Sequence, residues 1–279
     1  MERALFSVAM SVYKNDEPAF FDRALQSITE FQTVPPDEII LVADGPLSDG
    51  LNAVIDKYLE KYDFFKVIRL EKNGGLGNAL KIAVDNCSHG LIARMDSDDV
   101  AVPDRFYTQL KFFKNNPATD IVGGDITEFT GEETNVVSMR KVPSSNEEIA
   151  KFLKKRCPFN HMTVMFKKSA VLSAGGYKDL FWNEDYYLWI RMFENGAVMA
   201  NTGTTLVNVR TGKDMFKRRG GFKYFKSEKF LQKYMLNKKI INFGTYFTNV
   251  IKRFIVEILL PASVRSAVFK KFARNEKQV

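Results

Sequence analysis

Three carboxylates stand within four residues at Asp96-Ser97-Asp98-Asp99, directly after a segment, 91–95, that reads as a buried strand. Carboxylates packed this closely repel one another unless a cation compensates. Oxygen-rich clusters of this kind suit Mg²⁺ or Mn²⁺, which also hold the phosphates of substrates. An acidic turn that caps the helix expected near Pro103 is the plainer alternative, but one cap needs only one Asp. The cluster therefore predicts a divalent metal site.

A second acidic pair, Glu184 and Asp185, opens a predicted helix over 184–194. The helix dipole favours negative charge at this end, so a helix cap is one interpretation. A carboxylate beside an apolar wall can instead have a raised pKa and act as a general base. The pair is flanked by aromatic residues of the kind that stack on sugar rings: Phe181, Trp182, Tyr186, Tyr187 and Trp189. The sequence leaves the cap and the base equally open.

The elements that must position these residues alternate in the first half of the chain. Strands are expected at 5–13, 38–43, 65–70 and 91–95, each followed by a helical pattern, with Asn15 or Asp16 capping the first helix. Such repeats predict a parallel sheet covered on both faces, with ligands bound beyond the carboxyl ends of the strands. Asn15, Asp44, Asn73 and the 96–99 cluster all follow strand ends.

The order of elements becomes mixed after Pro103. Strands are expected at 121–129, 136–142, 162–166 and 197–210, helices at 146–156 and 184–194, and helical structure from 213 onward. We therefore predict an α/β fold with a mixed, mainly parallel sheet flanked by helices and a C-terminal helical extension. The expected division is 1–210 for a catalytic domain and 211–279 for the extension.

The composition of the 279 residues, 45% hydrophobic and 27% charged, is ordinary for a globular chain and argues against disorder, collagen and a multi-span membrane protein. Two cysteines and two histidines exclude a disulfide scaffold and a structural zinc site. No signal peptide or uncharged run near the ~20 residues of a membrane span is visible, so a cytoplasmic location is expected.

The charge is unevenly divided. Residues 211–279 hold 17 Lys and Arg against 4 Asp and Glu, whereas residues 1–210 carry a net charge of −5. Aromatic residues are interleaved with the basic ones from Phe222 onward. Basic amphipathic helices with aromatic faces bind membrane interfaces, although helices packed on the catalytic domain with basic outer faces would look the same. The asymmetry predicts a polyanionic partner, and a membrane surface is our first expectation.

Three further signals are weak on their own. Gly74-Gly75-Leu76-Gly77 is neither a dinucleotide fingerprint nor a Walker loop. His161 is a lone histidine, for which a structural role is the commoner one. Arg218 and Arg219 could clamp a diphosphate, because guanidinium groups bind phosphate oxygens in pairs, but isolated arginines more often form a solvated basic face.

Taken in order, six segments of the chain resemble the family 2 glycosyltransferases with the GT-A fold. They are Ser11-Val12-Tyr13-Lys14-Asn15, Val42-Ala43-Asp44-Gly45, residues 73–80, Asp96-Ser97-Asp98-Asp99, Gly175-Gly176-Tyr177 and residues 184–191. Residues 160–169 and 215–221 resemble the bacterial exopolysaccharide and O-antigen branch, the amylovoran-type enzymes.

The resemblance implies a nucleotide-sugar site built from residues at the strand ends and in the loops that follow: Ser11, Tyr13, Asn15, Asp44, Asn73, Gly74 and Asp96, with Arg218 and Arg219 on the diphosphate. Asp98, together with Asp99, would hold Mn²⁺ or Mg²⁺. Asp185, with Glu184 beside it, would take the proton from the acceptor hydroxyl while the anomeric centre is inverted.

The resemblance also implies the substrates. A nucleotide-diphosphate sugar, with UDP the commonest nucleotide, would donate one sugar to a polyprenyl-diphosphate-linked saccharide at the cytoplasmic face of a bacterial inner membrane. Many family members carry two acidic residues after the second strand, whereas Ala43 takes the first of these positions here. The Gln-x-x-Arg-Trp motif of processive synthases is absent, which favours transfer of a single sugar.

Two other function classes remain as alternatives. A sugar-phosphate nucleotidyltransferase shares the sheet and the metal, but normally has a Gly-rich basic loop where Tyr13-Lys14-Asn15-Asp16 stands. A non-enzymatic binder of nucleic acid or another polyanion would use the basic tail, but would leave the acidic cluster unexplained, and we expect no nucleic-acid partner. A dinucleotide oxidoreductase is disfavoured by the missing glycine fingerprint.

Overall fold

The computed structural model describes residues 3–212, 220–261 and 275–276. Its first half is a parallel sheet in the order β3-β2-β1-β4, made by β1 (Phe6–Val12), β2 (Glu38–Ala43), β3 (Phe65–Arg69) and β4 (Leu91–Met95). The four strands coincide with the apolar segments expected from the sequence. Their carboxyl ends therefore lie along one edge, where ligands bind in sheets of this kind.

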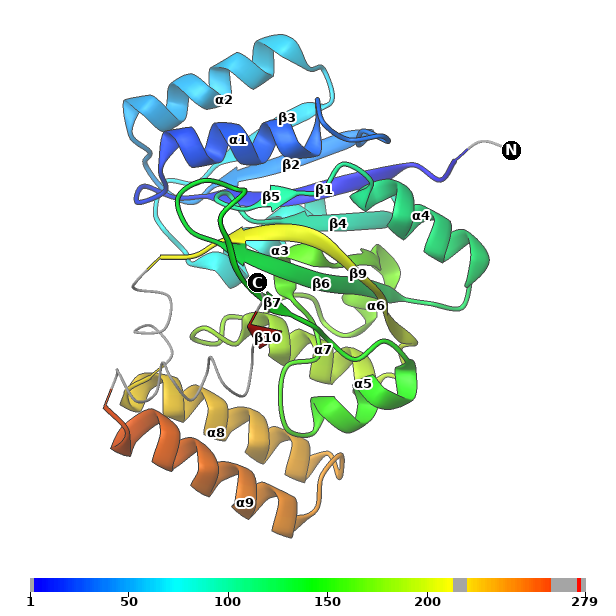
Figure 1. Cartoon of the computed structure of the whole chain (residues 1–279), viewed down its shortest axis with the longest axis vertical. Coiled ribbons are helices and arrows are strands. Elements are labelled where there is room, and N and C mark those ends of the chain that lie inside the picture. Colours follow the sequence, from blue (N-terminus) through cyan, green and yellow to red (C-terminus); the bar gives the residue numbers. More distant parts are fainter. Residues whose placement is uncertain (1–2, 213–219, 262–274, 277–279) are drawn as a thin grey trace.

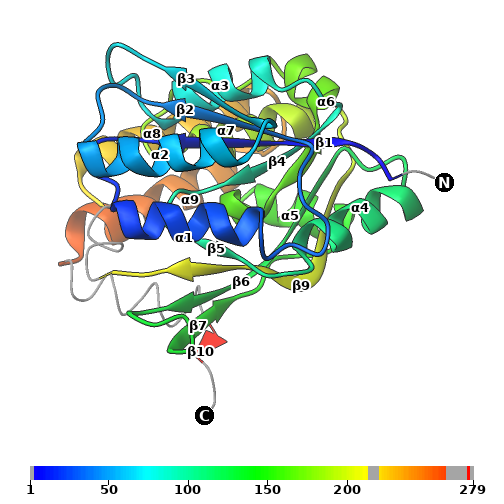
Figure 2. The ribbon, with the colours of Figure 1, turned by 90° about the horizontal axis from the view of Figure 1, so that it is seen from above.

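The second half extends the same sheet with mostly antiparallel strands. Next to β4 lies β8 (Met165–Lys167), followed by β6 (Ile121–Phe129), β7 (Val136–Arg140) and β10 (Asn275–Glu276). Strand β9 (Met199–Arg210) runs parallel to β6 and pairs with β5 (Val100–Ala101). Figure 2 shows β6, β7, β9 and β10 at one side of the sheet and β2 and β3 at the other. The predicted mixed sheet flanked by helices is confirmed; β5 and β10, of two residues each, are too short to leave a pattern.

Helices cover both faces of the sheet because the strand side chains point alternately to two apolar cores. Val8 and Met10 belong to one core, which is closed by α1 (Pro18–Ile28), α2 (Asp49–Lys61) and α4 (Arg105–Asn115). Ala9 belongs to the other, which is closed by α3 (Leu76–Asn86), α5 (Asn146–Leu153), α6 (Lys168–Ser173) and α7 (Glu184–Glu194). A 3₁₀ turn at His161–Thr163 leads into β8.

The predicted cap of the first helix is wrong. Helix α1 begins at Pro18 after Glu17, with no side-chain cap bond. One oxygen of Asp16 instead accepts hydrogen bonds from the backbone N–H of Tyr13 at 3.0 Å and from the hydroxyl of Ser97 at 2.8 Å. Asp16 therefore joins the loop after β1 to the acidic cluster after β4.

Two further helices form a hairpin at the end of the molecule opposite α1 and α2 (Figure 1). They are α8 (Phe222–Asn237) and α9 (Phe243–Phe254), and a π-helical turn at Ile255–Leu259 continues α9. The break between them contains buried Ile241 and ends at Asn242, whose side chain accepts from the backbone N–H of Thr245. Across the described part of the chain, no helix is long and apolar enough to span a membrane.

Candidate active site

Asp44, at the end of β2, organises the glycine-rich loop before α3. Its carboxylate accepts hydrogen bonds from the backbone N–H groups of Gly74 at 2.6 Å and Gly75 at 3.0 Å, and from the Asn73 side chain at 3.0 Å. Gly45 has φ +90° and would place a Cβ 2.7 Å from the Asn73 nitrogen, so only glycine fits this close approach. The structure thus brings together the predicted residues Asp44, Asn73 and Gly74.

The predicted residues of the first strand lie at the same edge. Ser11 is near the end of β1 and is half-buried, whereas Tyr13 and Asn15 belong to the loop that follows. The tie from Asp16 to Tyr13 and Ser97 holds this loop beside the acidic cluster. No contact of Ser11, Tyr13 or Asn15 identifies a ligand, so their nucleotide-binding role stays a prediction.

The three cluster carboxylates converge. Asp96, Asp98 and Asp99 each offer one oxygen, and these oxygens lie within 4.8 Å of one another. Asp96 pairs with Arg94, and Asp99 is buried and accepts the backbone N–H of Arg210 at 2.9 Å. Desolvation by the surrounding protein, with the charges of Asp96 and Asp16, raises the pKa of Asp98 to about 6. A carboxylate whose ionised form is disfavoured in this way is strongly stabilised by a bound cation.

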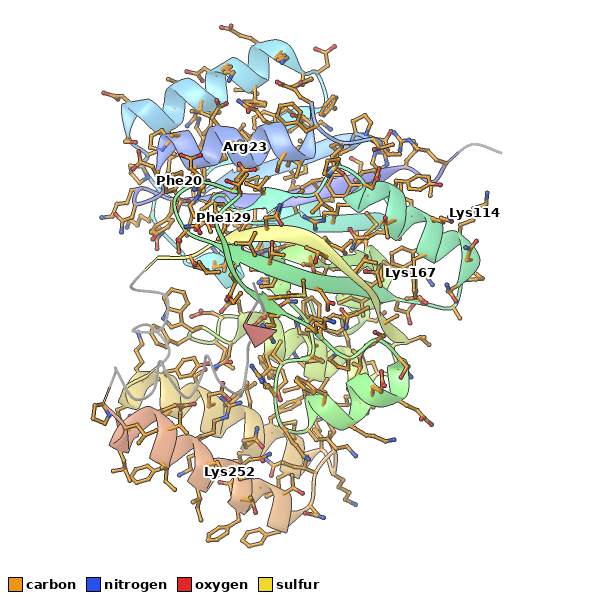
Figure 3. The ribbon with its side chains drawn as sticks, in the orientation of Figure 1. Phe20, Arg23, Lys114, Phe129, Lys167 and Lys252 are labelled. Carbon is orange, nitrogen blue, oxygen red and sulfur yellow. The ribbon has the colours of Figure 1, made fainter. Side chains whose placement is uncertain are left out.

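Arg210 fixes one side of this cluster from the end of β9. Its guanidinium lies over the ring of Phe20, 3.9 Å from the centroid, and over that of Phe129 at 4.7 Å. Figure 3 shows Phe20 and Phe129 close together beside β9. This stacking holds the backbone donor that binds Asp99.

Arg94 lies beneath the carboxylates. It is the fourth residue of β4, its side chain is only 2% exposed, and its guanidinium pairs with Asp96. Buried Arg105 of α4 supports the segment by donating to the Arg94 carbonyl at 2.6 Å and to the Met95 sulfur at 3.0 Å. The Arg94 charge opposes the rise in pKa of carboxylates on two separate elements: Asp98, Asp99, Glu184 and Asp185.

The second acidic pair lies at the start of α7. Burial and the charge of Asp185 raise the pKa of Glu184 to about 7. Burial also raises the pKa of Asp185, whose Oδ1 accepts the backbone N–H of Tyr186 at 2.6 Å. The thiol of Cys157 lies 3.7 Å from its Oδ2 and donates to it. A carboxylate with these surroundings holds a proton more tightly than free aspartate does, as a general base requires.

The glycine loop and the acidic pair also meet. A Cβ on Gly77, in the first turn of α3, would lie 3.2 Å from the Glu184 Cβ, so the starts of α3 and α7 pack against each other. Just before this point Trp182 adopts φ 57°, a left-handed conformation that bulky residues avoid, and its side chain is 49% exposed. An aromatic surface therefore adjoins the predicted base.

His161 has a structural role, and the structure does not test the predicted arginine pair. The His161 ring nitrogen Nε2 lies 2.9 Å from the Tyr177 hydroxyl, and burial lowers the pKa of His161 well below its usual range. The ring packs with Tyr177 and Trp189, which is a structural role. Arg218 and Arg219 lie outside the described residues.

Arg94, Cys157 and Asp16 contact the candidate site but were not predicted to belong to it. The one available signal was a charged residue, Arg94, inside an otherwise apolar strand next to an acidic cluster. Nothing in the sequence indicates that Cys157 meets Asp185, which is 28 residues away.

The cluster fits a divalent ion. Its donors are all carboxylate oxygens, which Mg²⁺ and Mn²⁺ prefer. One buried guanidinium offsets only part of the negative charge, as the raised pKa values of Asp98 and Asp99 show. Asp98 is the exposed member and could reach a substrate phosphate through the ion.

Comparison with known proteins identifies the class. The model of the family "Glycosyl transferase family 2" matches residues 7–181. Since this match spans more than half of the chain, the protein belongs to the family 2 glycosyltransferases, and it is a glycosyltransferase.

Two relatives match this chain over nearly their whole length. The chain is 40% identical over 270 residues to the "UDP-Gal:alpha-D-GlcNAc-diphosphoundecaprenol beta-1,3-galactosyltransferase" of Escherichia coli, covering 97% of each chain. It is 36% identical to the amylovoran biosynthesis glycosyltransferase AmsE of Erwinia amylovora, covering 96% of this chain and 98% of that one. The predicted amylovoran-type branch is confirmed.

Solved structures confirm the GT-A fold. Staphylococcus aureus TarS 1–349 in complex with UDP-GlcNAc is similar with a TM-score of 0.66 and 16% identity, over 90% of this chain and 72% of that one. The Pyrobaculum calidifontis mannosyltransferase PcManGT, in complex with GDP-Man and Mn²⁺, gives 0.63 and 14%, over 97% and 76%.

The Asp44 contacts generate the first prediction. Asp44→Asn replaces one acceptor oxygen with an NH₂ group that faces N–H donors, so we expect a loss of about 1–3 kcal/mol in the free energy of unfolding. The amide protons of Gly74 and Gly75 should also exchange faster. Urea denaturation and hydrogen exchange measure both, with the exposed Asp63→Asn as matched control. Unchanged exchange at both glycines would show that Asp44 does not organise the loop.

Proposed function

We propose that the protein transfers one sugar from a UDP-sugar to a hydroxyl of a polyprenyl-diphosphate-linked saccharide, with inversion, in the synthesis of a bacterial surface polysaccharide. Residues 1–210 would form the catalytic domain and 211–279 an extension facing the membrane. The observation that carries the proposal is the convergence of Asp96, Asp98 and Asp99 at the carboxyl edge of the sheet, near enough for the charge of Asp96 to act on Glu184. The activity named for the E. coli relative, which matches over 97% of each chain, supports the substrates.

The donor would lie across the strand ends. Ser11, Tyr13 and Asn15 would line one side of the nucleoside, and the loop held by Asp44 the other, with Asn73 and Gly74 over it. Asp96 would contact the ribose, and Arg218 and Arg219 the diphosphate.

Asp98 and Asp99 would hold Mn²⁺ or Mg²⁺ on the diphosphate. Such an ion, when bound, stabilises the negative charge that develops on the leaving phosphate. Arg94 then keeps Asp96 in place and limits the repulsion within the cluster. Both Asp98 and Asp99 must be ionised to bind the metal. Their raised pKa values oppose this ionisation until a cation is present.

The transfer itself is a single displacement. The acceptor oxygen forms a bond to the anomeric carbon as the bond from that carbon to the phosphate oxygen breaks, and UDP leaves with the electron pair. The acceptor proton passes to the Asp185 carboxylate, which the Tyr186 N–H and the Cys157 thiol orient. The aromatic surface at Phe181 and Trp182 would stack against a sugar ring of the acceptor.

A lipid-linked acceptor has to be met at a membrane surface. We therefore place the protein in the cytoplasm, peripherally attached to the cytoplasmic face of the inner membrane through its basic C-terminal helices. The lysine-rich surface of α8 and α9 supports this attachment.

Nucleotide binding tests the donor and the metal. Calorimetric titration with UDP, GDP and dTDP, each with and without Mn²⁺, should give binding of UDP that depends on the metal. We expect Asp98→Asn to weaken this binding at least tenfold, because the exposed ligand of the cluster loses its charge. Asp63→Asn should bind like the wild type. Binding of no nucleotide in either condition would contradict the proposal.

Kinetics test the base. Asp185→Asn should lower kcat about 10²- to 10⁴-fold, the usual contribution of a general base, with UDP binding unchanged. Because burial raises the pKa of Asp185, wild-type kcat should fall as the pH drops through this pKa, where the carboxylate becomes protonated.

The exposed Asp179, six residues earlier, supplies the matched control Asp179→Asn, which should leave kcat unchanged. Wild-type turnover in Asp185→Asn would remove this residue from the role. The same measurement on Glu184→Gln separates the two carboxylates of the pair.

A further inference from the structure

Helix α9 leaves a row of large apolar side chains uncovered. None of its twelve residues is buried. Six side chains on α9 and the following turn are between 40% and 67% exposed: Phe243, Phe247, Ile251, Phe254, Ile255 and Leu259. Steps of three and four residues place them along one side of the helix. Figure 3 shows side chains projecting from α9 on the side away from the sheet.

The opposite side of α9 is firmly attached. The Asn249 amide donates to the Lys154 carbonyl at 2.9 Å and to Gln232 at 2.8 Å. Phe254, at the edge of the row, is itself held by the Phe225 ring, which packs edge to face with it, 5.6 Å between centroids. The helix therefore has a fixed orientation, and its apolar row is not a poorly packed part of the core.

The exposed charged side chains of residues 222–259 are lysines. Residues 222–259 contain seven lysines, all of them exposed: Lys223, Lys226, Lys229, Lys233, Lys238, Lys239 and Lys252. The same residues contain two carboxylates, Glu228 and Glu257. Both are buried against Arg253, with nitrogen–oxygen distances of 2.8 and 3.2 Å. Apart from Lys238, which pairs with Glu194 of α7 at 2.6 Å, α8 and α9 therefore present to solvent apolar groups and lysines without an ion-pair partner among the described residues. An anionic membrane interface attracts this combination.

A pocket of about 440 Å³ lies where α8 turns into α9, next to the start of the row. Its lining is partly apolar and includes two lysines: Lys154, Leu236, Lys239, Ile240, Ile241, Asn242 and Thr245. Two ammonium groups beside an apolar wall match a lipid phosphate joined to an acyl chain. A second copy of this chain would instead bring lysines against lysines, which repel.

We propose that the apolar row of α9 inserts into the headgroup region of an anionic bilayer, with a lipid phosphate in the pocket between Lys154 and Lys239. The proposed membrane binding rests on the proposed function only for its biological purpose, which is to bring the enzyme to its lipid-linked acceptor. The binding itself needs no catalysis.

Flotation of the full-length protein with vesicles tests the row. We expect binding to vesicles of phosphatidylethanolamine and phosphatidylglycerol, and at least tenfold weaker binding after Phe243→Ser with Phe247→Ser. The matched control is Phe31→Ser with Tyr107→Ser, two aromatic residues of similar exposure elsewhere on the surface, which should bind like the wild type. Undiminished flotation of the α9 variant would overturn the proposal.

Two further measurements separate the alternatives. Lys154→Gln with Lys239→Gln should weaken flotation with the anionic vesicles at least threefold and leave any weak binding to pure phosphatidylcholine vesicles unchanged. An equal loss of binding to both kinds of vesicle would show that the pocket does not bind a lipid phosphate. If the wild-type protein were a dimer and the α9 variant a monomer, the apolar row would instead be the contact surface for a second copy of this chain. Metal-dependent UDP binding, measured on the same variants, should stay at the wild-type level, so a failure of docking is distinguishable from a failure of the proposed function.

Discussion

The site depends on one buried positive charge. Arg94 lies under carboxylates that come from two distant segments of the chain, and it moderates the pKa of four of them while pairing with a fifth, Asp96. Without it, burial and mutual repulsion would protonate the cluster or push its members apart. Arg94 alone does not balance the negative charge of these carboxylates. The excess negative charge that remains favours a divalent ion at this site.

The fold serves mainly to bring these groups to one edge. Parallel pairing of β1, β2 and β4 aligns their carboxyl ends, so that Asp16, Asp44 and Ser97 lie in adjacent loops. The second core then packs α7 against α3 so closely that a Cβ on Gly77 would lie only 3.2 Å from the Glu184 Cβ. Helix packing thus places the predicted base, and strand register places the predicted metal ligands.

Much of this arrangement could be predicted from the sequence. Strand ends followed by Asp44 and by the 96–99 cluster are local signals, because the alternation of apolar strands and helices determines the edge at which they meet. The interactions that were missed join segments far apart in the sequence. Asp16 was expected to cap a helix, as the local pattern allowed, but it binds Ser97 instead, and only tertiary structure brings Cys157 to Asp185.

The C-terminal hairpin is part of the same mechanical unit as the base. Ser227 of α8 accepts a hydrogen bond at 3.0 Å from Asn183, the residue before Glu184, and the Tyr187 ring packs against Phe230 and Tyr234. Since α9 is also fixed to α8, direct side-chain contacts connect the apolar row to α7 through α8. A bilayer that held this row would therefore also set the height and tilt of Asp185 above the membrane. Such a constraint suits an enzyme whose acceptor hydroxyl is itself tethered at a fixed distance from the lipid surface.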